Sequence, residues 1–167
     1  VYDELGINSR LDSFQAMVLS IKLRHLERWT EARRDLAAHY DALLRERGAL
    51  SAEEPFSPDR PGVKLLAPTP APARHTHHRY VVRIEAERRD GLMQALRSEG
   101  IGCEVYYPRG LHQQPALAAW APARALIEVE RATRECLALP LYPELPRDQQ
   151  DHVIETLIET IAPMLKV

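Results

Sequence analysis

The sequence predicts an α+β fold in which one long amphipathic helix leads into a small domain of helices and short strands. Apolar residues recur mostly every three, four or seven positions over residues 11–43, which is helix periodicity. After a proline-rich stretch, β-rich and helical segments follow, with too few strands for a complete α/β enzyme. The expected parts are an N-terminal segment with the long helix at 1–48, a connector at 49–74 and an α+β small domain at 75–167.

The long helix is expected to begin near Ser9 and to end at Gly48. Ser9 and Asp12 have the spacing of a capping box, and Gly48 supplies a left-handed stop. A helix of about 35 residues spans about 50 Å, which is longer than a small domain is wide. It therefore either packs against more protein than this chain provides or covers a local core as a surface helix. Its apolar stripe consists of Leu11, Phe14, Val18, Ile21, Leu26, Trp29, Leu36, Tyr40 and Leu43.

The remaining elements follow from local composition. Six prolines between residues 55 and 72 remove backbone donors and predict an extended connector. Beyond it, β-branched and aromatic residues predict strands, and three- or four-residue apolar spacing predicts helices. The expected order is a strand at 78–84, a helix at 90–99 ending at Gly100, a strand at 103–107, a helix at 123–136, a short apolar segment at 137–140 and a helix at 147–165.

Composition excludes several classes of partner. The chain has 167 residues, 45% of them hydrophobic, which is enough to bury a core. Its 22 basic and 24 acidic residues are interspersed, so no single-sign field favours nucleic acid. No apolar run approaches the ~18 residues that span a membrane, and the first residues lack the basic-then-apolar order of a signal peptide. We expect a soluble, cytoplasmic protein in which Cys103 and Cys136 are free thiols.

Two segments concentrate polar recognition groups. Residues 105–115 leave a strand and present Tyr106, Tyr107, His112 and two glutamines on one loop, a density that suits a sugar or nucleotide. The alternative is that either tyrosine packs in the core and that His112 caps a turn. Asn8 and Arg10 stand beside a helix N-terminus, where an amide and a guanidinium suit phosphate or carboxylate. Taken alone, this second segment is only a helix cap.

Together these segments resemble the DegT/DnrJ/StrS family of pyridoxal-phosphate-dependent sugar aminotransferases. The resemblance covers essentially the whole chain. Six motifs occur in the family's order, and coincidence does not produce such an order. The motifs are Gly6-x-Asn8-Ser9-Arg10-Leu11-Asp12, Lys22-Leu23 with Arg33, His75-x-x-His78-x-Tyr80, Val105-Tyr106-Tyr107-Pro108, Leu111-His112-x-Gln114-Pro115 and Leu137-Ala-Leu139-Pro140-x-Tyr142-Pro143.

The resemblance implies the long interdomain helix and C-terminal small domain of a fold-type-I aminotransferase, whose overall family is α/β. It implies a homodimer with active sites shared between subunits, acting on a nucleotide-linked keto-sugar with glutamate as amino donor, in cell-envelope or antibiotic sugar biosynthesis. Pyridoxal 5'-phosphate would be bound mainly by an N-terminal domain outside this chain. Asn8 would contact the cofactor, and Arg10, Tyr107 and His112 would lie near the substrate.

No catalytic residue is predicted within the chain. Transamination needs a Schiff-base lysine, and Lys22, Lys64 and Lys166 stand in a helix, a connector and the C-terminus, so we expect the chain alone to be inactive. One alternative is a non-catalytic regulatory or interaction protein on the same scaffold. Another is a metal module, for which the spacing matches no closed zinc site, and no metal ligands are predicted. Its candidate ligands are His75, His77, His78, Cys103 and His112.

Overall fold

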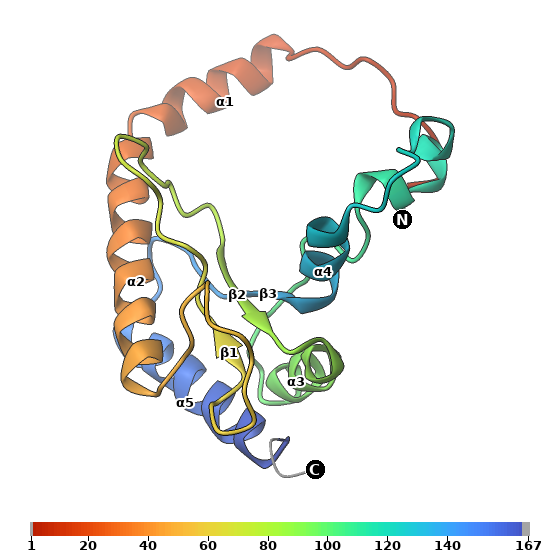
Figure 1. The fold of residues 1–167 in the computed structure, drawn as a ribbon. Helices are drawn as coiled ribbons and strands as arrows, with labels where there is room; N and C mark the ends of the chain where they lie inside the picture. The colour runs from red at the N-terminus through yellow and green to blue at the C-terminus, as the bar shows by residue number, and fades with distance from the viewer. Residues whose placement is uncertain (1, 165–167) are drawn as a thin grey trace.

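The computed structural model describes residues 2–164 and confirms the α+β class (Figure 1). A three-stranded antiparallel sheet stands at its centre, in the order β1 (Val63–Lys64), β2 (Tyr80–Ile84) and β3 (Cys136–Leu139). Val63 pairs with Ile84 in the first ladder. The second ladder runs from Tyr80 opposite Leu139 to Arg83 opposite Cys136, so β3 lies along nearly the whole of β2.

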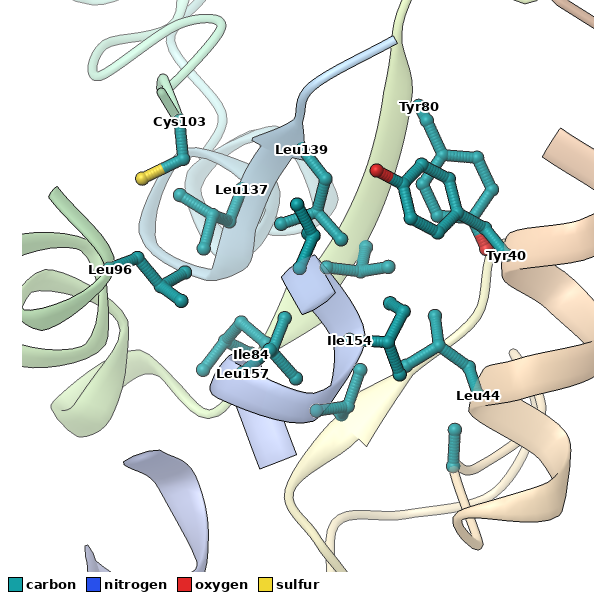
Figure 2. Packing of buried hydrophobic residues seen from close by; sticks show 14 of the residues in the cluster. Tyr40, Leu44, Tyr80, Ile84, Leu96, Cys103, Leu137, Leu139, Ile154 and Leu157 are labelled. Carbon is teal, nitrogen blue, oxygen red and sulfur yellow. The ribbon is translucent and has the colours of Figure 1, made fainter. Parts of the chain in front are cut away.

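Helices cover one face of this sheet and close the core. They are α2 (Leu26–Glu46), α3 (Ala86–Ser98) and α5 (Arg147–Met164), and α5 packs against both α2 and α3. Because side chains alternate along a strand, every second residue of β2 points into the core. The buried cluster joins these positions to the helices, as Figure 2 shows for Tyr40, Leu44, Tyr80, Ile84, Leu137, Ile154 and Leu157.

The other face of the sheet meets α4 (Ile127–Glu135). Arg83 of β2 lies on this face and forms an ion pair with Glu135 at 2.7 Å, with both side chains largely buried. The loop before α4 contains two short 3₁₀ helices, η1 (Leu111–Gln113) and η2 (Pro115–Trp120). This face therefore carries the loop that the sequence singled out for recognition.

The prediction of a single long helix is wrong, because the structure has two helices, α1 (Ser13–Leu23) and α2, separated at Arg24 and His25. The His25 N–H donates to the Lys22 carbonyl at 2.9 Å, a tighter turn than the helical repeat. Core packing stabilises only α2, whereas α1 has no buried residue. The predicted Ser9 cap is also wrong, since the Asp12 side chain accepts from the Gln15 N–H at 2.8 Å. Gly48 has φ +82° after α2, as expected of the stop.

Other expected boundaries differ as well. The predicted strand at 103–107 reduces to a single bridge between Glu104 and Ala138, and the Cys103 carbonyl accepts from the Arg97 side chain instead of from a strand. Two helices begin elsewhere: α3 begins four residues early, and α4 begins four residues late, after a bent segment that follows Pro122. The proline-rich connector contains β1, which sequence reasoning missed because it is two residues long. The expected helix end at Leu165, and Lys166, lie outside the described residues.

Apolar side chains surround α1 on every side. Phe14 is 71% exposed, and α1 stands apart from the sheet in Figure 1. A helix that is apolar all round is normally buried, so this surface is suited to association. The exposed apolar residues of this segment are Ile7, Leu11, Phe14, Met17, Val18, Leu19, Ile21, Leu23 and Leu26. Within residues 2–164, no helix combines the length and apolar character needed to cross a bilayer.

We predict that the chain self-associates through α1 and that Phe14→Glu weakens this association. Removing a buried phenylalanine from the contact costs about 1.5–3 kcal/mol, which corresponds to about tenfold or more in the dissociation constant. Sedimentation velocity over a concentration series measures the effect. Ser20→Glu is the matched control, because it adds the same charge to an exposed polar position on the same helix. A monomeric wild-type chain at high concentration would contradict the prediction.

Candidate functional site

The loop that follows Glu104 carries two tyrosines in different settings. Glu104 pairs with Ala138, so the chain enters this loop from the edge of the sheet. The Tyr106 ring lies 3.4 Å from the guanidinium carbon of Arg79, a cation–π contact that holds the ring. The Tyr107 ring meets Tyr106 edge to face at 5.8 Å and is 59% exposed. Tyr106 is therefore a packed residue, whereas Tyr107 is accessible to a ligand.

A cavity of about 660 Å³ lies beside these rings, and we name it the tyrosine cavity. This volume falls in the range of small-molecule sites. Its walls come from the N-terminal segment, the 106–114 loop, α4 and the first residue of β3. The lining residues are Tyr2, Tyr106, Tyr107, Arg109, Gly110, Leu111, Gln114, Glu128, Val129, Ala132, Thr133 and Cys136.

His112 faces another cavity. Its ring is largely buried, and its Nε2 lies 3.4 Å from Glu130 Oε1. A Cβ at Gly110 would stand 2.7 Å from the His112 ring and 2.8 Å from Val129, so only glycine leaves this room. The cavity beside His112, of about 370 Å³, is also lined by apolar residues that include Trp120. Tyr107 and His112 thus share a loop but line two cavities, with Val129 in the wall of both.

Asn8 and Arg10 lie apart from both cavities. Both residues are exposed, on the extended segment that runs from Tyr2 to α1 (Figure 1). Neither lines a cavity described here, so within residues 2–164 the structure does not bring them together with Tyr107 or His112. Their exposed amide and guanidinium remain accessible to an anion from outside the chain.

A buried glutamine connects the two predicted segments. Gln114 is only 3% exposed, its Oε1 accepts from the Tyr2 N–H at 3.0 Å, and its Nε2 donates to the Arg109 carbonyl at 3.4 Å. The Ala116 N–H donates to the Tyr2 carbonyl at 3.0 Å. The N-terminal segment is therefore fixed to the loop at Tyr2. Sequence reasoning noted Gln114 only within a motif, because burial of a loop amide leaves no periodic signal.

Lys64 departs from its expected setting. It belongs to β1 and is 9% exposed, with its Nζ 4.6 Å from the centre of the Phe56 ring. Burial, followed by the positive charge of Arg83, lowers the pKa of this ammonium group. The place of Lys64 in the connector gave no indication of this burial. Lys64 nevertheless lines neither the tyrosine cavity nor the cavity beside His112.

Both cysteine thiols are at least partly buried. Cys136 lines the tyrosine cavity and is half-buried, and burial is the main cause that raises its pKa. Cys103 is 2% exposed, and burial raises its pKa too. Over residues 2–164, no three His, Cys, Asp or Glu side chains gather closely enough to hold a metal ion.

The fold is similar to part of solved aminotransferase structures. The crystal structure of S. venezuelae DesV in complex with a ketimine intermediate superposes with a TM-score of 0.74 and 37% identity, over 93% of this chain and 38% of that chain. The profile of the DegT/DnrJ/EryC1/StrS aminotransferase family matches residues 1–158. The chain belongs to this family.

Two curated relatives of this chain carry different names. The pleiotropic regulatory protein of Geobacillus stearothermophilus is 41% identical over 93% of this chain and 38% of its own length. The dTDP-3-amino-3,4,6-trideoxy-alpha-D-glucose transaminase of Streptomyces venezuelae is 35% identical over 95% of this chain and 38% of its own length. The chain thus spans less than two fifths of the relatives that it matches.

We predict that Gln114→Leu destabilises the chain by about 1–3 kcal/mol, because the hydrogen bonds to the Tyr2 N–H and the Arg109 carbonyl are lost, at about 0.5–1.5 kcal/mol each. Urea unfolding measures this loss, and faster hydrogen exchange at the Tyr2 amide locates it. Gln94→Leu, an exposed glutamine on α3, is the matched control. Equal stability of both variants would show that the Gln114 contacts do not hold the segment.

We predict that iodoacetamide modifies Cys136 more slowly than N-acetylcysteine at pH 8. A raised pKa leaves less thiolate at this pH, so the rate should keep rising to a higher pH than for a free thiol. Mass spectrometry of the Cys103→Ser variant isolates the Cys136 reaction. An inflection at or below the pH of the free thiol would contradict the prediction.

Proposed function

We propose that the complete protein is a pyridoxal-phosphate-dependent aminotransferase that transfers an amino group, from glutamate, to a nucleotide-linked keto-sugar. The single observation that carries this proposal is the family profile, which matches 158 consecutive residues. The transaminase name of the Streptomyces relative supports a nucleotide-sugar substrate. This chain would contribute the C-terminal part of an enzyme whose active sites are shared between two subunits.

We assign the substrate contacts to two side chains of the 105–115 loop that line cavities. We assign Tyr107 to the sugar nucleotide, because its phenol is exposed at a cavity of ligand size. We assign His112 to the same substrate, with Glu130 orienting its ring. In this assignment one extended ligand occupies both cavities, which lie on either side of Val129. Arg10 would supply a cationic contact from the N-terminal segment.

Pyridoxal phosphate supplies the electron sink that transamination needs. Among the described residues, Asn8 fits the edge of its site, because an exposed amide can donate to one phosphate oxygen. The Schiff-base lysine is not assigned to this chain, since Lys22 is exposed on α1 and Lys64 is packed against Phe56. We therefore propose that this chain alone does not catalyse transamination.

A second candidate function is a non-catalytic regulatory protein on the same scaffold. The name of the Geobacillus relative, which is 41% identical, favours it. The two candidates differ in one measurable property, because only the enzyme must bind the cofactor covalently. A full-length protein that shows no cofactor absorption after incubation with pyridoxal phosphate would support the regulatory function.

We predict that in the full-length protein Tyr107→Phe and His112→Gln raise KM for the sugar nucleotide or lower kcat, while cofactor absorption stays unchanged. Loss of one hydrogen bond to an uncharged group costs about 0.5–1.5 kcal/mol, a change of about 2- to 12-fold in kcat/KM. Asn8→Ala should instead weaken cofactor retention in dialysis.

Two exposed residues that line none of the cavities serve as matched controls. Tyr142→Phe removes a phenol and His152→Gln removes an imidazole outside the cavities described here. Both controls should keep wild-type KM and kcat. If Asn8→Ala, Tyr107→Phe and His112→Gln all gave the same kinetic change, the assigned roles would be wrong.

A further inference from the structure

A third cavity, of about 450 Å³, lies between α2 and the chain that leads into β2, and we name it the histidine cavity. In Figure 1 the segment from β1 to β2 runs alongside α2, and two hydrogen bonds from α2 confirm that they are neighbours. The residues that line the histidine cavity are Arg34, Ala37, Ala38, Asp41, Leu66, Ala67, Pro68, Thr69, Ala73, Arg74, His75, His77, Arg79, Tyr80 and Val81.

Two arginines of α2 hold the backbone that carries the histidines. Arg33 Nε donates to the Thr76 carbonyl at 3.4 Å, and Arg34 Nη1 donates to the His75 carbonyl at 3.1 Å. The His77 N–H donates to Nδ1 of His75 at 2.8 Å. Because Nδ1 accepts, the neutral His75 ring carries its proton on Nε2, which is then a hydrogen-bond donor. The His75 and His77 rings lie 4.1 Å apart, so two imidazoles share this cavity.

The charges around the histidine cavity are unbalanced. Asp41 is its one lining carboxylate, and it already accepts from the Tyr80 hydroxyl at 2.7 Å and from Arg45 at 3.1 Å. Two carboxylates of α2 outside the cavity lining, Glu27 and Glu31, pair with Arg34 and Arg74. Among the described residues that line the histidine cavity, three arginines stand against the single carboxylate of Asp41, so the lining carries more positive than negative side chains. The arginines are Arg34, Arg74 and Arg79.

Arg79 is the lining arginine without a carboxylate partner in the described part of the chain. Its guanidinium lies against the Tyr106 ring, which lines the tyrosine cavity on the other side. Stacking leaves the edge of a guanidinium, with its N–H donors, open to an anion. The Arg79–Tyr106 stack therefore connects the histidine cavity to the tyrosine cavity.

We propose that the histidine cavity binds a phosphate or diphosphate group through Arg79 and His75, with Arg34 adding positive charge. Guanidinium and imidazole N–H donors are suited to phosphate oxygens, and a diphosphate fits within about 450 Å³. We favour the diphosphate of the sugar nucleotide as the bound group, a choice that rests on the proposed function. The reason is that Tyr106, which stacks on Arg79, also lines the tyrosine cavity. Free phosphate or pyrophosphate shares the same chemistry.

The test uses this chain and sodium pyrophosphate as the probe, with isothermal titration calorimetry and imidazole NMR shifts as readouts. Binding should shift the His75 ring resonances, and Arg79→Gln and His75→Gln should each weaken it about tenfold or more. Arg124→Gln is the matched control, because Arg124 is exposed and lines none of the cavities. Circular dichroism checks that each variant is folded. Absence of binding, or equal weakening by Arg124→Gln, would overturn the proposal.

A competition experiment separates the two sources of phosphate. Displacement of pyrophosphate by dTDP-glucose or UDP-N-acetylglucosamine, but not by thymidine or uridine, supports the nucleotide sugar. Pyrophosphate binding that neither nucleotide sugar displaces would overturn that source and retain a site for free phosphate. Displacement by glutamate at lower concentration than by any phosphate would overturn the phosphate assignment. These results do not depend on transaminase activity, so they are distinct from a failure of the proposed function.

Discussion

Two buried tyrosines couple the second helix to the central sheet, and the rest of the domain depends on this contact. The rings of Tyr40 and Tyr80 lie side by side, 4.8 Å apart (Figure 2). Both phenols donate a hydrogen bond, Tyr40 to the Pro140 carbonyl and Tyr80 to the Asp41 carboxylate. Burial raises the pKa of both phenols well above the usual range, so both stay neutral donors. Gln150 of α5 adds a fully buried bond to the Leu36 carbonyl. Helix α2 is thereby fixed on the sheet together with its arginines.

A second set of polar contacts holds the opposite face. Arg83 reaches Glu135 across the sheet surface, and Arg89 of α3 donates to the Thr133 and Cys136 carbonyls at the end of α4. Breaking a largely buried pair of this kind by removing one partner leaves an uncompensated charge. These contacts fix α4, which forms one wall of the tyrosine cavity. The loop at residues 105–115 is therefore positioned by the sheet at one end and by α4 along its side.

The elements with strong local signals agree between sequence and structure. The β-branched run before residue 84 forms β2, the left-handed Gly48 follows α2, and 147–164 forms α5. Boundaries that depend on distant contacts were not predictable. The division at His25 arises because α2 has a core to pack against and α1 has none, and β1 exists only because β2 lies beside it. Gln114 and Lys64 owe their burial to segments far away in the chain.

The sequence by itself determined the fold class, the family motifs and which loop concentrates polar groups, because these depend on residue type and short-range spacing. Only the tertiary structure decided which of those groups share a cavity. It separates Tyr107 from His112 at Val129, leaves Asn8 and Arg10 on an exposed segment, and brings Arg79 against Tyr106. The reason is that a cavity is formed by side chains from several elements, and their meeting depends on packing over long sequence separations.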